Sequence, residues 1–314
     1  MRKLLLGVAL SALMTGMAHA EKIGVSMALF DDNFLTVLRN GMVEQAKGMK
    51  GVELQVEDAQ NDVAKQLDQI KNFAASGVDA IIVNPVDTSA TQAMSDAAKA
   101  ANIPLVYVNR QPINVDTLPD KQAFVASNEE ESGTLETKEV CRLLKEAGKT
   151  EAAAYVMQGE LSNQAAVQRT KDIHDVIGSG DCGVKITIIA EQTANWSRDQ
   201  AQNLMTNWLS TNTPFDALIS NNDEMAIGAI QAMKAANVDM KKVVVAGVDA
   251  TQDALAAMQA GDLDATVFQD AAGQGAGALD AALKLAKGEK VEKKVYIPFK
   301  LVTPANMAEY MKKN

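Results

Sequence analysis

Ten polar and aromatic side chains lie where apolar runs of the sequence give way to helical patterns or, in the case of Arg169, further along such a helix. They are Asp32, Phe34, Asn109, Arg110, Asn163, Arg169, Trp196, Asn222, Asp249 and Gln269. Carboxylates, amides and guanidinium groups can together satisfy hydroxyl groups, each of which both donates and accepts a hydrogen bond. The two aromatic rings suit the apolar C–H faces of a sugar-like ring. If the fold brings these residues together, their chemistry predicts recognition of a polyhydroxylated ring.

Each of these residues also has an explanation that involves no ligand. Asp32, Asn222 and Asp249 lie where helices are expected to begin, and acids and amides are common helix caps. Arg110 and Arg169 could form surface ion pairs, which contribute little to stability. The ligand-binding hypothesis depends on all ten residues sharing one edge of the fold.

The elements that must position these side chains alternate between strand and helix. Apolar runs rich in Val and Ile begin near residues 22, 52, 79 and 103, with helical patterns at about 32–47, 61–76 and 88–101. The same order starts again after residue 122, with helices expected near 130–146, 163–177, 198–209 and 224–236. This alternation predicts parallel sheets covered on both faces. In such sheets ligands bind beyond the carboxyl ends of the strands, where the ten residues lie.

Two stretches of the sequence repeat one another faintly. "DAIIVNPVDTSATQAMSDAAKAAN" begins at Asp79 and "DALISNNDEMAIGAIQAMKAAN" begins at Asp216. The repeat supports two lobes of like fold, and the absence of a Pro/Gly/Ser-rich linker suggests short crossing segments with a hinge. Since the ten residues come from both halves, they could converge only on a cleft between the lobes.

The first twenty residues are typical of a secretory signal peptide. Arg2 and Lys3 precede an apolar stretch over 4–14, and Ala18 and Ala20 frame a small-residue cleavage site. The 294 residues that remain suggest two domains of about 100 to 200 residues each. Without Arg2 and Lys3, 28 basic residues face 40 acidic ones. A net charge of −12 argues against nucleic acid or an anionic membrane surface as a partner.

The chain contains two cysteines, Cys141 and Cys182. An exported protein can form a disulfide, but spacing alone cannot place the two Cα atoms within bonding range. A disulfide and a reduced, buried pair both stay open.

An enzyme is disfavoured by the residues available. After the signal peptide the one histidine is His174, on the helical pattern that contains Arg169, so a Ser-His-Asp triad or a multi-histidine metal site has little material. We expect His174 at a helix surface and Trp208 in the core. "GSGDCG" at 178–183 follows a helix rather than a strand, and "GQGAGA" at 273–278 falls within a helix expected from Asp270. Neither run meets the order that a dinucleotide site requires.

Taken together, five motifs resemble those of the periplasmic sugar-binding proteins of ABC transporters, of the ribose- and galactose-binding type. The motifs are "DDNF" at 31–34, "VNR" at 108–110, "ANWS" at 194–197, "NNDEMAIGA" at 221–229 and "GVDA" at 247–250. The resemblance covers the whole chain after the signal peptide. "GVSMALFDDNFLT", "DIHDVI" and "EQTANWS" look most like the rhizopine- and inositol-binding members.

The resemblance implies an α/β fold of periplasmic binding protein type I, with two Rossmann-like, doubly wound lobes joined by a three-strand hinge. The expected lobes are 21–127 with 270–298, and 128–269 with 299–314. The lobes would close over a cyclic polyol in the periplasm. Hydrogen bonds to hydroxyls are implied for Asp32, Asn109, Arg110, Arg169, Asn222, Asp249 and Gln269. Phe34 and Trp196 would stack on the ring faces.

The resemblance also narrows the ligand and the partners. Where galactose binders carry His and Asp after "GE", this chain has Asn163 and Ala165, which argues against hexose specificity. The acid-rich calcium loop of some galactose binders is missing, so no metal and no cofactor are expected. The implied partner is an inner-membrane ABC permease serving a monomer, with a chemotaxis receptor as an alternative output. A repressor core of similar fold is disfavoured, because an export signal occupies the place of its DNA-binding helices.

Overall fold

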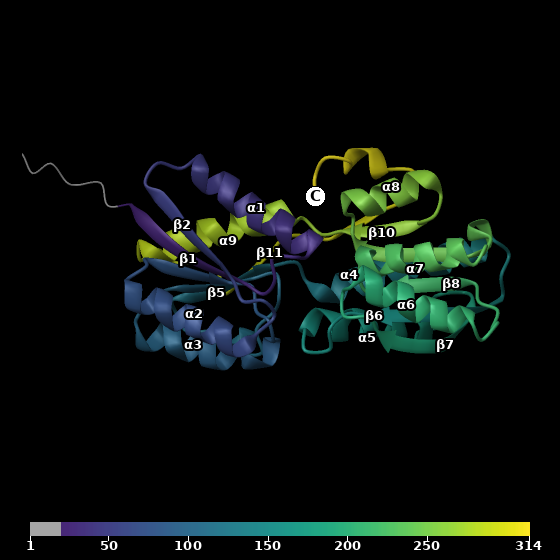
Figure 1. Cartoon of the computed structure of the whole chain (residues 1–314), viewed down its shortest axis with the longest axis horizontal. Helices are drawn as coiled ribbons and strands as arrows, with labels where there is room; N and C mark the ends of the chain where they lie inside the picture. The colour runs from purple at the N-terminus through teal and green to yellow at the C-terminus, as the bar shows by residue number, and fades with distance from the viewer. Residues whose placement is uncertain (1–19) are drawn as a thin grey trace, which may run out of the picture.

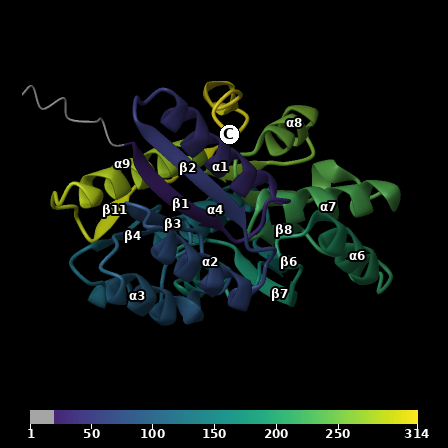
Figure 2. The same cartoon turned by 60° about the vertical axis from the view of Figure 1, so that its left-hand side comes forward.

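The computed structural model describes residues 20–314, in which two α/β lobes lie side by side (Figures 1 and 2). The predicted signal peptide lies outside the described residues apart from its last one. Within residues 20–314 no helix is long and apolar enough to cross a membrane. The seven helices expected by residue range are confirmed, each within three residues of its predicted bounds.

The first lobe is built on a parallel sheet in the order β11-β5-β4-β3-β1-β2. In that order the strands are Lys294–Tyr296, Gln122–Ala126, Leu105–Val108, Ala80–Val83, Glu21–Met27 and Val52–Asp58. Its helices are α1 (Asn33–Lys47), α2 (Val63–Ser76), α3 (Thr91–Ala100) and α9 (Ala271–Ala286). Helices α1 and α9 cover one face while α2 and α3 cover the other, so β3, β4 and β5 are buried throughout.

The second lobe has its sheet in the order β12-β10-β9-β8-β6-β7. In that order the strands are Lys300–Val302, Ala265–Phe268, Val244–Asp249, Ala217–Ser220, Glu151–Gln158 and Lys185–Thr193. Its helices are α4 (Glu129–Glu146), α5 (Gln164–Gly178), α6 (Arg198–Leu209), α7 (Asp223–Ala235) and α8 (Gln252–Ala260). The expected parallel pairing is confirmed except at the edge, where β12 runs antiparallel to β10. The second sheet thus repeats the strand order of the first.

The faint sequence repeat corresponds to a repeated structure. Asp79 and Asp216 precede β3 and β8, which hold the same place in the two sheets. The Asp79 carboxylate accepts a hydrogen bond from the Lys22 N–H in β1 at 2.7 Å. In the second lobe, the Asp216 carboxylate accepts from the Ala153 N–H in β6 at 2.8 Å. The two lobes therefore share a fold down to single hydrogen bonds.

The described chain crosses between the lobes three times, which confirms the expected three-strand hinge. The crossings follow β5, β10 and β11, and the first two lead directly into helices α4 and α9. Asn128 and Asp270 cap these two helices, each through a side-chain oxygen that accepts a backbone N–H. The C-terminus lies between the lobes (Figure 1), where Asn314 Nδ2 donates to the carbonyl oxygens of Asp249 and Gln269.

The glycine-rich run at 273–278 serves helix packing. It lies inside α9, as expected, where this helix crosses α1. A Cβ at Gly275 would lie 2.6 Å from the Leu38 carbonyl oxygen, so only glycine allows the two helices to approach this closely. The run therefore lies inside a packed helix, as expected, and not in a strand-to-helix turn.

Cys141 on α4 and Cys182 before β7 form a disulfide, with Cα atoms 5.0 Å apart. The bond lies in the core between α4, α5 and the second sheet. Of the two possibilities that the sequence left open, a disulfide and a reduced pair, the structure contains the disulfide.

Candidate ligand-binding site between the lobes

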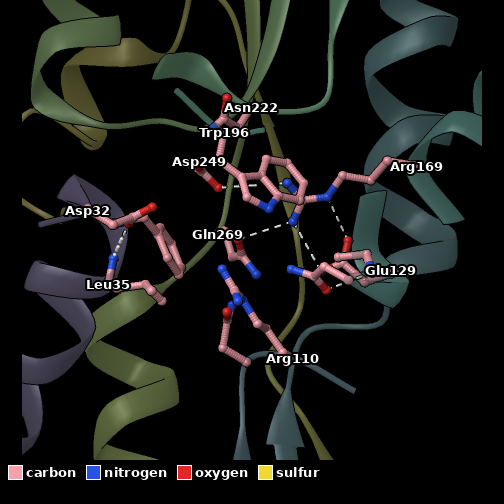
Figure 3. Close-up of a pocket in the computed structure, with 13 residues that line it drawn as sticks. Asp32, Leu35, Arg110, Glu129, Arg169, Trp196, Asn222, Asp249 and Gln269 are labelled. Carbon is pink, nitrogen blue, oxygen red and sulfur yellow. Dashed lines mark hydrogen bonds and ion pairs between the residues drawn. The ribbon is translucent and has the colours of Figure 1, made fainter. Parts of the chain in front are cut away.

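A pocket with about 380 Å³ of space not occupied by atoms lies between the lobes (Figure 3). It is lined by Asp32, Phe34, Leu35, Asn109, Arg110, Glu129, Asn163, Ala165, Arg169, Trp196, Asn222, Asp249 and Gln269. The structure therefore brings together all ten residues singled out in the sequence.

Three of these residues also begin helices. Asp32, Asn163 and Asn222 are the N-caps of α1, α5 and α7, and the side-chain oxygen of each accepts a backbone N–H. The capping explanation and the pocket position therefore hold at once, because a cap uses one side-chain oxygen and leaves other polar capacity free. Asp249 does not begin a helix as expected. It ends β9, and Thr251 caps α8 instead.

Arg110 is buried at the pocket wall of the first lobe and forms no exposed surface pair. Its Nη1 donates to the carbonyl oxygens of Pro85 (3.0 Å) and Val86 (3.3 Å). The same nitrogen lies 3.8 Å from the Glu160 carboxylate of the second lobe. Burial lowers the pKa of Arg110, while Glu160 and Asp32 act in the opposite direction. Arginine nevertheless stays protonated in proteins, so a positive charge faces the pocket.

Arg169 is also buried, in contrast to the surface alternative. Its Nε and Nη2 donate to the two oxygens of Glu129 at 2.8 and 3.0 Å, and Nη1 donates to the Asn221 carbonyl at 2.7 Å. Nη2 also donates to Gln269 Oε1 at 3.3 Å. Burial alone would lower the pKa of Arg169, but the surrounding acids, Glu129 first and then Asp249 and Glu136, together make the net shift upward. The guanidinium is held rigidly by this bidentate pair.

Asp249 faces the pocket with a weakly compensated carboxyl group. It is buried, and its Oδ1 lies 4.0 Å from Arg169 Nη1. Burial raises its pKa well above the usual range, although Arg169 opposes this shift. The backbone φ of +124° is rare for a residue other than glycine, and such strain is typical of functional positions.

Two buried donors at the pocket have no hydrogen-bond partner among the described residues: Trp196 Nε1 and Gln269 Nε2. Trp196 has a φ of +61°, and its ring packs over Gly159, where a Cβ would come within 2.2 Å. The Arg169 guanidinium carbon lies 5.7 Å from the centre of the Trp196 ring. A buried donor without an acceptor costs about 1–3 kcal/mol. The pocket is thus suited to a ligand that offers acceptor oxygens to these two groups.

Hydrogen bonds join the rims of the lobes around the pocket. Asn33 Nδ2 donates to Glu224 Oε1 at 2.8 Å, and Asn61 Nδ2 donates to Glu160 Oε1 at 2.9 Å. The N–H of Thr88 donates to a second-lobe carbonyl, that of Ser162, at 3.1 Å. Each pair joins a first-lobe residue to a second-lobe residue, so the structure shows the lobes closed.

Three lining residues were not predicted from the sequence: Leu35, Glu129 and Ala165. Glu129 begins α4 as the first of three consecutive acids, a pattern that reads as a complement to the helix dipole. Leu35 and Ala165 lie one and two positions from predicted residues and carry no polar signal of their own.

Two residues expected outside the site lie outside it. Trp208 is buried in the second lobe with its ring stacked on Tyr155, the centroids 4.5 Å apart. His174 has a half-exposed side chain whose Nε2 lies 2.7 Å from Glu191. Within residues 20–314, no cluster of three or more His, Cys, Asp or Glu side chains could hold a metal ion.

Comparisons with known proteins agree with this geometry. A family model described as "Periplasmic binding protein domain" matches residues 23–290. The chain is 64% identical, over the full 314 residues of both proteins, to a Rhizobium meliloti protein described as "Putative rhizopine-binding protein". An ABC transporter solute binding protein from Bacillus halodurans with bound myo-inositol has a TM-score of 0.88 and 41% identity. That match covers 96% of this chain and 100% of the other.

A second solved structure is similar at lower identity. The Caulobacter myo-inositol binding protein bound to myo-inositol has a TM-score of 0.81 and 29% identity, covering 94% of this chain and 96% of the other. With two like-folded lobes closed around a polar pocket, the chain belongs to the periplasmic binding protein family, whose members bind solutes.

Proposed function

We propose that this protein captures a cyclic polyol, of the inositol or rhizopine kind, in the periplasm and delivers it to an ABC importer. The observation that carries the proposal is the closed pocket, which residues of both lobes line and which two buried, unpartnered donors face. The Rhizobium meliloti relative and the two inositol-bound structures support the choice of ligand.

The lining matches a polyol group by group. Asp32 and Asp249 can accept hydrogen bonds, Arg110 can donate, and the amides can do both. Hydrogen bonds to charged groups contribute about 1.5–3 kcal/mol each, whereas micromolar affinity requires about 8 kcal/mol. A few such bonds, together with apolar contact from Phe34 and Trp196, exceed this requirement even after the cost of closure.

Closure is the step that would couple binding to transport. The ligand contacts both lobes and so favours the closed arrangement over the open one by its differential affinity. The rim hydrogen bonds, such as Asn33 to Glu224, join the two lobes and would break if the lobes moved apart. A permease could thereby distinguish loaded from empty protein. The proposal also includes an export signal over residues 1–20 and boundaries between the lobes near residues 127, 269 and 298.

Calorimetry with myo-inositol, scyllo-inosamine, ribose and galactose tests the function. We expect the two cyclitols to bind at micromolar concentration or tighter, and ribose and galactose at least tenfold more weakly. If the carboxylates face an ammonium group, scyllo-inosamine will bind more tightly than myo-inositol. Failure of all four ligands to bind would overturn the proposed ligand class.

Trp196 provides an independent measurement. The sequence contains two tryptophans, and Trp208 is buried in the core of the second lobe. We therefore expect polyol binding to change the intrinsic fluorescence through Trp196, and Trp196→Ala to abolish this change and weaken binding at least 30-fold. Unchanged affinity in both Trp196→Ala and Asp249→Ala would contradict the assigned site.

A further inference from the structure

A chain of buried amides runs from the first sheet past the pocket to the hinge. Asn84 Nδ2 donates to Asn109 Oδ1 at 3.3 Å, and Asn109 Nδ2 donates to Gln274 Oε1 at 3.2 Å. Gln274 Nε2 in turn donates to Ser127 Oγ at 3.0 Å. Ser127 belongs to the first crossing segment between the lobes, and Gln274 lies on α9. We call these four residues the amide chain.

Backbone groups fix the direction of the amide chain. The Ala28 N–H donates to Asn84 Oδ1 at 3.4 Å, and Asn84 Nδ2 donates to the Val108 carbonyl at 3.2 Å. A backbone N–H only donates and a carbonyl only accepts, so the Asn84 amide has a single orientation. Its Nδ2 then faces the Asn109 oxygen. The Asn109 amide is therefore set from one side by Asn84 and from the other by Gln274.

Gln274 contributes to the pocket only through Asn109. It is fully buried and lies outside the pocket lining, whereas Asn109 is part of that lining. An amide has two N–H donors and an oxygen with two lone pairs. The amide chain uses one donor and one lone pair of Asn109, which leaves one of each for a ligand.

We propose that Gln274 is a positioning residue for polyol binding, which holds the Asn109 amide in one orientation and anchors it to the hinge at Ser127. This inference rests on the proposed function, since the polyol is the ligand that Asn109 would serve. Without Gln274 Oε1, Asn109 Nδ2 loses its fixed acceptor, and the amide can rotate away from the ligand.

A double-mutant cycle with myo-inositol as the probe tests the inference. Gln274→Met keeps the length of the side chain but removes both hydrogen bonds of the amide chain. We expect calorimetry to show about tenfold weaker binding for Gln274→Met, or about 1.4 kcal/mol. Because Gln274 acts through Asn109, adding Gln274→Met to Asn109→Ala should cost less than a further twofold. Losses that multiply in the double variant would overturn the inference.

Gln122 supplies a matched control. It is a buried glutamine of the same lobe, and its Nε2 donates to the Ser95 carbonyl at 2.8 Å, outside the amide chain. Gln122→Met should lower Tm about as much as Gln274→Met while changing the affinity less than twofold. Equal weakening of binding by both variants would show a general packing effect and would overturn the positioning role.

A ligand-free measurement separates this inference from the proposed function. The side-chain N–H signals of Asn109 in an NMR spectrum, identified by their loss in Asn109→Asp, should shift in Gln274→Met and stay in place in Gln122→Met. If no polyol bound the wild-type protein, the proposed function would fail, yet these signals would still decide the role of Gln274. Unshifted Asn109 signals in Gln274→Met would overturn it.

Discussion

Asn109 and Asp249 occupy equivalent places in the two lobes, at the carboxyl ends of β4 and β9, the fourth strand of each lobe along the chain. Neutral amides hold Asn109 on both sides. Asp249 instead carries a buried carboxyl group whose nearest cation, Arg169, is 4.0 Å away. The same position in one fold thus presents a fixed amide in one lobe and a buried, ionisable carboxyl group in the other.

Asn84 and Asn221 follow β3 and β8, and the side-chain oxygen of each accepts a backbone N–H, but their further contacts differ. The Asn84 side chain donates to the next member of the amide chain, Asn109. The backbone carbonyl of Asn221 instead accepts from the Arg169 guanidinium, which also pairs with Glu129. At these equivalent strand ends the first lobe therefore sets geometry through neutral amides. The second lobe places the Arg169–Glu129 ion pair and the Asp249 carboxyl group there, and its contribution should depend on ion pairing and on pH.

Removal of Arg169, the buried cation of the second lobe, should have the largest effect on both stability and polyol affinity. Arg169→Met leaves Glu129 buried without its partner, which typically costs about 3–5 kcal/mol of the free energy of unfolding. We expect that loss in urea denaturation and at least 100-fold weaker polyol binding in calorimetry. Lys171→Met is the control, because Lys171 pairs with Asp175 on the exposed face of the same helix, and such a pair contributes little to stability. Near-wild-type affinity in Arg169→Met would contradict a contribution of the second-lobe ion pair to polyol binding.

Removal of the disulfide should destabilise the second lobe more than the first. It closes a loop with a sequence separation of 41 residues, which corresponds to a stabilisation of about 4 kcal/mol in the chain-entropy model. In the double variant Cys141→Ser with Cys182→Ser, we expect the second lobe to lose stability by up to this amount, with affinity unchanged within threefold. Hydrogen exchange measured by peptide should show faster opening in the second lobe. Equal loss of protection in both lobes would contradict this expectation.

Asp172 in the second lobe should contribute to the pH dependence of the free energy of unfolding. Burial raises the pKa of Asp172 on α5 from 3.8 to about 7. Because the folded pKa is the higher one, this group contributes stability that is complete below pH 3.8 and is lost as the pH rises through about 7. We expect the free energy of unfolding of ligand-free protein to fall across this window, and Asp172→Asn to reduce the slope. Asp175 is largely exposed on the same helix, so Asp175→Asn should keep the wild-type slope of the free energy of unfolding against pH. If Asp172→Asn leaves that slope unchanged, Asp172 is not the group responsible.

The smallest effect is expected at the rim. Asn33→Ala removes the exposed hydrogen bond to Glu224, which keeps its contact with Arg198. We expect about twofold to fourfold weaker polyol binding by calorimetry, since exposed polar contacts contribute less than about 1 kcal/mol. Asn40→Ala, exposed on the same helix, should have no measurable effect. A tenfold loss of affinity in Asn33→Ala would contradict the expectation that exposed rim contacts contribute less to binding than the buried pocket residues.

Much of the fold and the positions around the pocket were predictable from the sequence, because the signals are local. Apolar strands alternate with amphipathic helices, and parallel strands end at one edge, so Asp32 and Asn109 were expected at one edge of the first sheet and Asp249 at the same edge of the second. The repeat at Asp79 and Asp216 indicated two lobes for the same reason.

Features that depend on packing were not predictable. Only the fold shows that Glu129, rather than the acids after it, pairs with Arg169. Gln274 lies in a glycine-rich run that reads as helix packing, and nothing local links it to Asn109. Asp249 was expected to begin a helix, but the positive φ values of Asp249 and Ala250 delay the helix to Gln252. The antiparallel direction of β12 likewise follows from the hinge rather than from the composition of the strand.

The three crossings mean that neither lobe is one uninterrupted piece of the polypeptide. Helix α9, whose Leu279 and Leu283 belong to the core of the first lobe, and strand β11 at the edge of its sheet are made only after nearly all of the second lobe. The first lobe therefore cannot complete its core until nearly all of the second lobe has been made. A chain that stopped before α9 would lack both this helix and the edge strand β11, and so could not form the first lobe as described.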